Sequence, residues 1–190
     1  MHKPKKGANI NLEFIFAWLE WSLDHSYHYK GNIMHKKMAE LAMDIVREPI
    51  EKLGYEIVEV NCNTQNTNET HLTIYIFSFN GITLDDCVKV NDLVGPLLDE
   101  VDISNGKPYV LNISSPGLDR QIVTDDDYRR NINEVVDVKV AQKGLKGNFF
   151  TGKIISYSKD AFNLELLRNG KTIEIYRDNV TSLLKHIKFK

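Results

Sequence analysis

The stretch "YVLNISSPGLDR", from Tyr109 to Arg120, marks the place where this chain changes character. Its first five residues read as a short strand, and the turn segment follows directly: Ser114, Ser115, Pro116, Gly117, Leu118, Asp119 and Arg120. Pro116 fixes the φ that the second position of a turn needs, and Gly117 can adopt the positive φ of the third. We predict a rigid, exposed turn that acts as a docking element between two domains. An ordinary interdomain turn is the alternative, which a Pro-Gly pair alone favours.

The other residues of this segment have expected roles that follow from their chemistry. The hydroxyls of Ser114 and Ser115 are available to the backbone or to a partner, and Leu118 is expected to anchor the linker into the second domain. Asp119 and Arg120 are expected to pair with each other or across the junction. Because an exposed pair stabilises a fold by only about 1 kcal/mol or less, a binding role for Arg120 is the competing interpretation.

Before the turn, the chain alternates helices and strands. A helix ends at Gly54, and Pro49 should bend or break it near residues 45–49; its apolar stripe comprises Met38, Leu41, Ala42, Ile45, Pro49 and Leu53. Strands are expected over about 55–62, 71–79 and 108–114. A second helix starts at a Thr83 cap, with Asp86 completing a capping box, and its expected buried residues are Leu84, Cys87, Val90 or Asn91, Val94 and Leu98.

The order α-β-β-α-β predicts an α/β N-terminal domain over residues 34–120, a three-stranded sheet with two helices on one side. After the turn, "TDDDYRRN" (Thr124 to Asn131) reads as a short capped helix. Strands are expected over about 134–141, 148–157, 161–167, 171–176 and 179–184, and Asn169-Gly170 is typical of a tight primed hairpin turn. Five short strands predict a small all-β SH3-like or Sm-like barrel over residues 121–190. The fold class is therefore α+β.

Charge divides the chain in the same way. The net charge is −2 overall, but residues 34–120 carry −7 and residues 121–190 carry +4. An acidic domain beside a basic one suits a partner of both signs, such as RNA together with basic protein. The alternative, that the imbalance serves solubility only, stays open. The two cysteines, Cys62 and Cys87, are too few for a disulfide framework and indicate reduced thiols in a cytoplasmic protein.

The first 33 residues form an atypical N-terminal extension. The apolar run "FIFAWL" at 14–19 is too short to span a membrane, and no cleavage site follows it. Lys30-Gly31 must be encoded by a purine run shaped like a ribosome-binding site, a few nucleotides before the codon for Met34. We therefore interpret residues 1–33 as a possible translated leader, with a lineage-specific arm as the alternative.

The sequence offers no enzymatic motif. It contains no Gly-x-Gly-x-x-Gly, no Gly-Lys-Ser/Thr loop and no Gly-x-Ser-x-Gly elbow. Asp85 and Asp86 lie where they complement a helix dipole, and neither Ser114 nor Ser115 has a nearby histidine in the sequence. No catalytic, metal or cofactor site is predicted, so the chain is expected not to be an enzyme.

Two groups of basic residues are candidates for binding RNA. Lysines cluster around the first two strands of the second domain, with aromatic residues between them: Lys139, Lys143, Lys146, Lys153, Lys159, Phe149, Phe150 and Tyr157. Lys143 and Lys146 are the best candidates because they flank a turn. Arg129 and Arg130 form a second site. The alternatives are that the aromatics are core, and that Asp125 to Asp127 pair with the arginines.

The run "LNISSPGLDR" (Leu111 to Arg120) closely resembles the signature of the ribosome maturation factor RimP family. Upstream, "LGYEIVEV" (Leu53 to Val60) and "GITLDDCVKV" (Gly81 to Val90) resemble the first strand and second helix of that family, in the same order. The resemblance covers about residues 34–190, and the ten-residue run is far more specific than a lone Pro-Gly turn.

This resemblance implies a monomeric, cytoplasmic protein without catalytic activity, cofactor or membrane association. It implies binding to the free 30S small ribosomal subunit, through 16S rRNA and a ribosomal protein near the decoding region, and assistance at a late step of subunit maturation. Two other classes stay open. An Sm-like RNA-binding regulator would form rings, and an SH3-type adaptor would need an exposed aromatic groove for proline-rich ligands.

Overall fold

The structure is a computed structural model that describes residues 33–64, 69–141 and 148–187. The chain divides between Ser115 and Pro116 into two compact units, which we call unit 1 and unit 2. The division falls inside the Ser114–Arg120 segment. Residues 1–32, which hold most of the expected leader, lie outside the described residues. None of the described helices is long and apolar enough to cross a bilayer.

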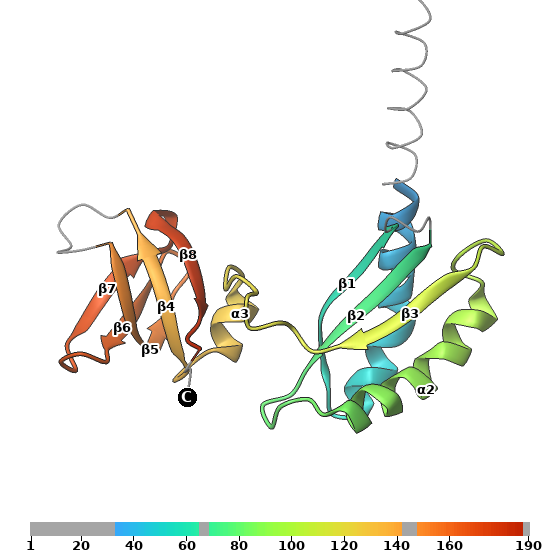
Figure 1. Ribbon diagram of the computed structural model, residues 1–190, viewed down its shortest axis with the longest axis horizontal. Coiled ribbons are helices and arrows are strands. Elements are labelled where there is room, and N and C mark those ends of the chain that lie inside the picture. The colour runs from blue at the N-terminus through green and yellow to red at the C-terminus, as the bar shows by residue number, and fades with distance from the viewer. Residues whose placement is uncertain (1–32, 65–68, 142–147, 188–190) are drawn as a thin grey trace, which may run out of the picture. The chain divides into compact units, whose positions relative to one another are not determined.

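Unit 1 is a three-stranded mixed sheet covered by two helices (Figure 1). The sheet order is β1 (Glu56–Thr64), β2 (Thr70–Phe77) and β3 (Tyr109–Ser114). β1 and β2 pair antiparallel, whereas β2 and β3 pair parallel and are connected by α2 (Leu84–Val101). The first helix covers residues 33–52. The predicted α-β-β-α-β order is confirmed.

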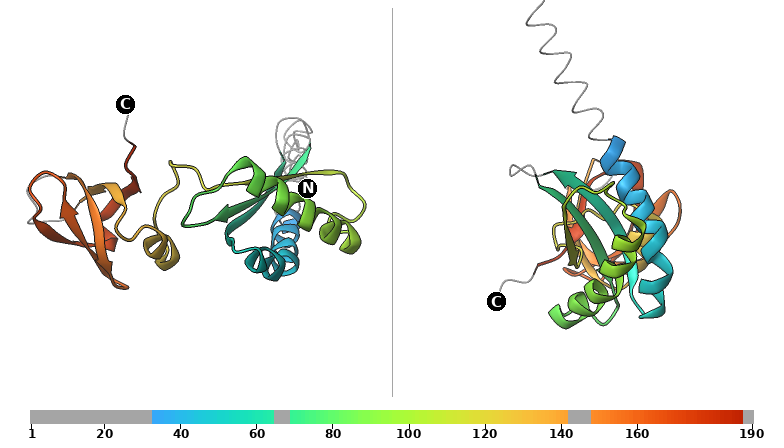
Figure 2. Two further views of the ribbon diagram at one scale, coloured as in Figure 1. Left: turned by 90° about the horizontal axis from the view of Figure 1, so that it is seen from below. Right: turned by 90° about the vertical axis from the view of Figure 1, so that its right-hand side faces the viewer.

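Both helices pack on the same face of this sheet, as expected and as Figure 2 shows. Helix 33–52 buries one residue per turn, because side chains four positions apart share a helix face. Alternate residues of β2 point into the same core, since side chains of a strand alternate between its two faces. The core residues of these elements are Met38, Ala42, Val46 and Ile50, then Leu72, Ile74 and Ile76, then Val90, Val94 and Leu98.

Two prolines lie inside helices without ending them. Helix 33–52 continues through Pro49, so of the expected bend or break near 45–49 the break does not occur, and α2 continues through Pro96. A proline in a helix interior costs about 3 kcal/mol, but buried residues on both sides, such as Val46 and Ile50, hold the helical path. Leu84 was expected in the core, but it is 80% exposed because it is the first residue of α2.

The capping box predicted for α2 is confirmed, and it is tied to the start of β1. The Thr83 side chain accepts from the Asp86 N–H, and the Asp86 carboxylate accepts from the Thr83 N–H. The Tyr55 hydroxyl donates to the other Asp86 oxygen at 2.6 Å. This hydrogen bond, followed by those from Thr83, lowers the pKa of Asp86 from 3.8 to about 2.

Replacing Tyr55 with phenylalanine should raise the pKa of Asp86 toward 3.8, because it removes the largest cause of the lowered value. In the wild type, the stabilisation from ionised Asp86 is fully present above 3.8 and is lost as the pH falls through about 2. Carboxyl-carbon NMR titration measures the pKa directly. Tyr109→Phe, which removes another hydroxyl of unit 1, is the control. An unchanged Asp86 titration in Tyr55→Phe would show that the hydrogen bond is not made in solution.

Unit 2 is a five-stranded antiparallel sheet preceded by a short helix. Its elements are α3 (Asp125–Arg130), β4 (Val135–Val140), β5 (Phe149–Tyr157), β6 (Ala161–Leu166), β7 (Thr172–Tyr176), η1 (Arg177–Asn179) and β8 (Val180–Lys185). The sheet order is β7-β6-β5-β4-β8. Since β7 and β8 are its two edges among the described residues, the hydrogen-bonded sheet is open. The expected SH3-like or Sm-like barrel is not confirmed.

The core of unit 2 is made by alternate residues of β4 together with large side chains from β6 and α3. Its fully buried members include Val136, Val138, Leu164, Phe162 and Tyr128. The hairpin between β6 and β7 differs from the tight primed turn expected. Gly170 has a positive φ but Asn169 does not, and the Gly170 N–H donates to the Leu166 carbonyl at 2.9 Å. The loop is therefore longer than two residues.

Candidate functional site

The Ser114–Arg120 segment contains a turn, but two positions later than expected. Ser114 ends β3, and its hydroxyl donates to the Ser115 carbonyl at 3.2 Å. The Arg120 N–H donates to the Gly117 carbonyl at 3.2 Å, so the turn spans residues 117–120. The prediction that Gly117 takes a positive φ is wrong, because Gly117 begins this turn and is not among the positive-φ glycines.

Gly117 is instead approached closely by a side chain of its own turn. A Cβ atom on Gly117 would collide with a carboxylate oxygen of Asp119. The Asp119 side chain therefore folds back over the start of its own turn, while remaining exposed to solvent. An alanine at position 117 would displace this flexible carboxylate rather than the backbone.

The anchor of the segment in unit 2 is Ile122, not Leu118. Leu118 is 56% exposed, so the expected anchoring role is wrong. Ile122 is buried, and its N–H donates to the Leu183 carbonyl of β8 at 2.9 Å. The Gln121 side-chain oxygen accepts from the Leu183 N–H at 3.0 Å. Residues 121–122 therefore attach to β8 and leave Leu118 in solvent.

Arg120 points to a buried carboxylate of α3. Its Nε lies 3.7 Å from Asp127 Oδ1, and the Arg130 guanidinium donates to the same oxygen at 3.2 Å. The side chains of Asp127 and Arg130 are only 6% and 8% exposed, whereas that of Arg120 is 33% exposed. We call Arg120, Asp127 and Arg130 the aspartate–arginine cluster. Arg120 thus has an ion-pair partner in α3, Asp127.

The second oxygen of Asp127 holds the start of α3. It accepts from the N–H groups of Thr124 and Val123 at 3.0 and 3.3 Å, and from the Thr124 hydroxyl at 2.8 Å. Burial alone would raise the pKa of Asp127, but the hydrogen bonds from Thr124 and Val123 and the charge of Arg120 outweigh it and lower the pKa. Asp127 is therefore ionised, and its carboxylate connects Arg120 of the turn to the start of α3.

The other acidic residues of α3 also pair with arginines, as the alternative interpretation anticipated. Arg129 Nε lies 3.3 Å from Asp126, and Arg177 donates to Asp125 at 2.6 Å. Arg177 also lies over the ring of Tyr128, 4.0 Å from its centroid. Burial, opposed by the Arg177 charge, raises the pKa of Tyr128 to about 12. Arg177 and Tyr128 were missed from the sequence because no local spacing connects them.

The lysine patch is described only in part. Lys143 and Lys146, its best candidates, lie outside the described residues. Lys139, Lys153 and Lys159 are exposed. Of the interleaved aromatics, Phe150 and Tyr157 pack against the core, whereas Phe149 is 53% exposed and lies opposite Lys139 on the neighbouring strand. An exposed aromatic beside a lysine can stack on a base or on an apolar side chain.

A family model described as the RimP N-terminal domain matches residues 45–119. The chain belongs to the RimP family. The matched range contains the sheet of unit 1, helix α2 and the turn segment through Asp119. RimP proteins are ribosome maturation factors that act without catalysis. Among the described residues, no group of three or more His, Cys, Asp or Glu side chains is arranged to hold a metal ion.

The Ser114–Arg120 segment of this RimP chain exposes two different kinds of side chain. Leu118 and Asp119 are exposed to solvent. Arg120 is positioned through its contact with the ionised Asp127. The turn can therefore present an apolar and an acidic group from a backbone that the aspartate–arginine cluster steadies.

Proposed function

We propose that this chain is a ribosome assembly factor that binds the free 30S small subunit and assists its maturation without catalysis. The observation that supports this proposal is the match of the RimP N-terminal domain over residues 45–119. The proposed partners are 16S rRNA and a small-subunit ribosomal protein near the decoding region. The proposed place of action is the cytoplasm, with the protein acting as a monomer.

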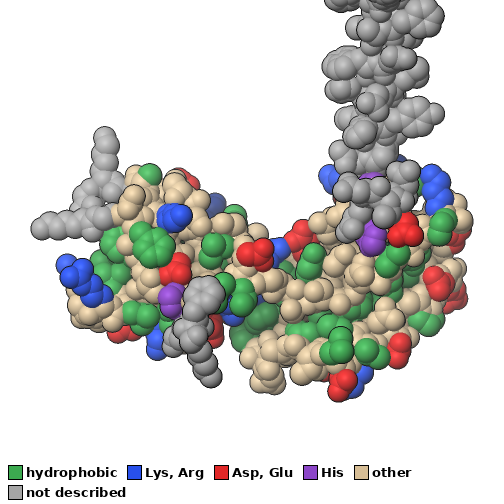
Figure 3. Space-filling model, viewed as in Figure 1, with side chains coloured by type: hydrophobic (Ala, Val, Ile, Leu, Met, Phe, Trp, Pro, Cys, Tyr) green, Lys and Arg blue, Asp and Glu red, His purple; other side chains and the backbone are tan. Residues whose placement is uncertain are grey.

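Charge suggests how the two units divide the work. Residues 34–120 carry −7 and residues 121–190 carry +4, and Figure 3 shows carboxylate side chains at several places on the surface of unit 1. The acidic unit is proposed to contact basic ribosomal protein, and the basic unit is proposed to lie nearer rRNA. Binding to 30S particles should therefore weaken with rising salt.

Unit 2 is proposed to curl into a barrel of the SH3-like or Sm-like type. Its last strand, β8, pairs with its first, β4, instead of with β7. This order brings the ends of the unit together, as in small barrels. Register irregularities in β4, at Lys139/Val140, and in β5, at Ile154/Ser156, add the bends that curling requires.

The Ser114–Arg120 segment, together with Arg129, Arg130, Lys143 and Lys146, is the proposed binding region. Arg120→Ala should lower the affinity for 30S particles by roughly tenfold, the value of one charge-assisted hydrogen bond. The fold should lose no more than about 1 kcal/mol, since Asp127 keeps Arg130 and three further donors. Arg168→Ala, which removes an exposed arginine of unit 2, is the matched control and should bind like the wild type.

Sedimentation of a cell lysate on a sucrose gradient tests the proposal as a whole. The protein should travel with free small subunits and be absent from assembled ribosomes. If purified protein does not bind 30S particles at low and moderate salt, the proposed function is wrong. If Arg120→Ala unfolds the chain instead of weakening binding, Arg120 is a structural residue.

A further inference from the structure

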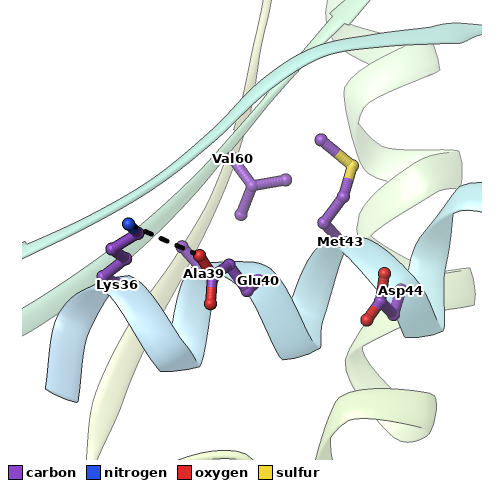
Figure 4. Close-up of a pocket in the computed structure, with 6 residues that line it drawn as sticks. All are labelled: Lys36, Ala39, Glu40, Met43, Asp44 and Val60. Carbon is purple, nitrogen blue, oxygen red and sulfur yellow. Dashed lines mark ion pairs between the residues drawn. The ribbon is translucent and has the colours of Figure 1, made fainter. Parts of the chain in front are cut away.

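A hollow of about 490 Å³ lies beside the outer strand of unit 1. Figure 4 shows Val60 of β1 and Met43 of helix 33–52 beside the space between these two elements, with Glu40 and Asp44 on the helix flank. We call this hollow, together with the β1 edge, the β1 groove. The residues that line the hollow are Lys36, Ala39, Glu40, Met43, Asp44 and Val60.

The strand that borders the hollow has a free edge. β1 is the first strand in the sheet order and pairs only with β2 among the described residues. Beyond an irregularity at Ile57/Glu59, the six residues from Glu59 to Thr64 pair with β2 in continuous register. Unpaired N–H and C=O groups along such an edge are a template for an added strand.

The side chains around this edge carry negative charge. Asp44 has no hydrogen-bond or ion-pair partner in the described part of the chain, and Glu40 meets only Lys36, at 3.9 Å. β1 itself contains Glu56 and Glu59 but neither lysine nor arginine. A second copy of β1 would therefore set like charges against each other, which disfavours self-pairing. A strand that carries lysine or arginine would instead be complementary.

We propose that the β1 groove binds an extended, basic segment of a partner protein as an added strand. Main-chain hydrogen bonds would form along Glu59–Thr64, and an apolar side chain of the segment would enter the hollow between Val60 and Met43. Lysine or arginine side chains two positions before and after it lie on the same face of the added strand and would meet Glu40 and Asp44. This inference rests on the proposed function, because the segment that binds is proposed to come from a ribosomal protein, a class of protein that contains extended basic segments.

The direct test uses a peptide probe with the full chain: an acetylated nonapeptide with valine at its centre, arginine two positions before and after the valine, and threonine elsewhere. NMR should show shifted and exchange-protected amides in β1 and shifts in helix 33–52. Glu40→Gln with Asp44→Asn should weaken binding by roughly tenfold. The control, Glu48→Gln with Glu51→Gln, removes the same charge from exposed residues of the same helix outside the hollow and should bind like the wild type. A peptide N-methylated at alternate residues should not bind, because it lacks the strand-forming donors.

Equal binding by the two double variants, unaltered binding of the N-methylated peptide, or protection at another strand edge would overturn the inference. The inference would also be overturned if the free protein self-associates and Glu40→Gln with Asp44→Asn changes that self-association, because the groove would then bind a second copy of the chain. Binding to 30S particles separates this inference from the proposed function. Failure of the wild type to bind them refutes the proposed function, whereas equal binding of wild type and the groove variant refutes only the groove.

Discussion

Gly152→Ala is expected to lower the free energy of unfolding of unit 2 by about 3 kcal/mol. Gly152 lies in β5, between Val136 of β4 and Leu166 of β6. A Cβ atom there would collide with the backbone carbonyl oxygen of Glu165 and would lie 2.9 Å from Leu164 Cγ. A neighbouring backbone cannot rotate away as a side chain can, so β5 and β6 would have to move apart.

Urea denaturation followed by the amide NMR signals of unit 2 measures this loss. The matched control is Gly95→Ala in α2, where a Cβ atom meets nothing within 4 Å and φ is not positive. That variant should change the unfolding free energy of unit 1 by less than about 1 kcal/mol. If Gly152→Ala has the same midpoint and slope as the wild type, the close approach of β5 and β6 is incorrect.

The sequence predicted the elements of both units because their signals are local. The alternating apolar residues of β2 and the Thr83–Asp86 capping box act within a few residues of one another. The capped helix at Thr124 is of the same kind, and its observed bounds, Asp125–Arg130, agree with the prediction. Periodicity and capping report such contacts directly.

The errors lie where tertiary packing decides the local conformation. Pro49 was expected to bend or break the first helix, but the helix runs on past it, with Ile50 buried in the core of unit 1. Leu118 was read as an anchor because it is apolar, but the backbone of Ile122 pairs with β8 and fixes the chain there. Neither outcome can be read from residue type, because each depends on a partner distant in the sequence.

The candidate site was predictable as a segment but not as a cluster. The "SSPGLDR" string predicted an exposed turn, and Leu118 and Asp119 are exposed. Arg120 lies outside the helix that carries Asp127, and Arg177 is distant in sequence from Asp125, so no helical or strand period reports either contact. The β1 groove also depends on the packing of helix 33–52 beside an edge strand.

Asp127→Ala is expected to destabilise unit 2 by about 4 kcal/mol, the cost of removing one partner from a buried ion pair. The substitution removes the carboxylate that faces buried Arg130 and Arg120, and it leaves the N–H groups of Thr124 and Val123 without their acceptor. Asp126→Asn is the control. The Asp126 side chain is 66% exposed and pairs with Arg129 on the surface, so its loss should cost less than about 1 kcal/mol.

The pH dependence of a third variant, Asp127→Asn, separates charge from shape. Because the folded-state pKa of Asp127 is lowered, its ionised form contributes stability that is fully present above 3.8 and is lost as the pH falls through the lowered value. The difference in unfolding free energy between wild type and Asp127→Asn should therefore shrink as the pH drops below 3.8. A difference that stays constant from neutral to acidic pH would mean that Asp127 acts through its shape and hydrogen bonds alone. Arg120 would then be positioned by something other than the charge of Asp127.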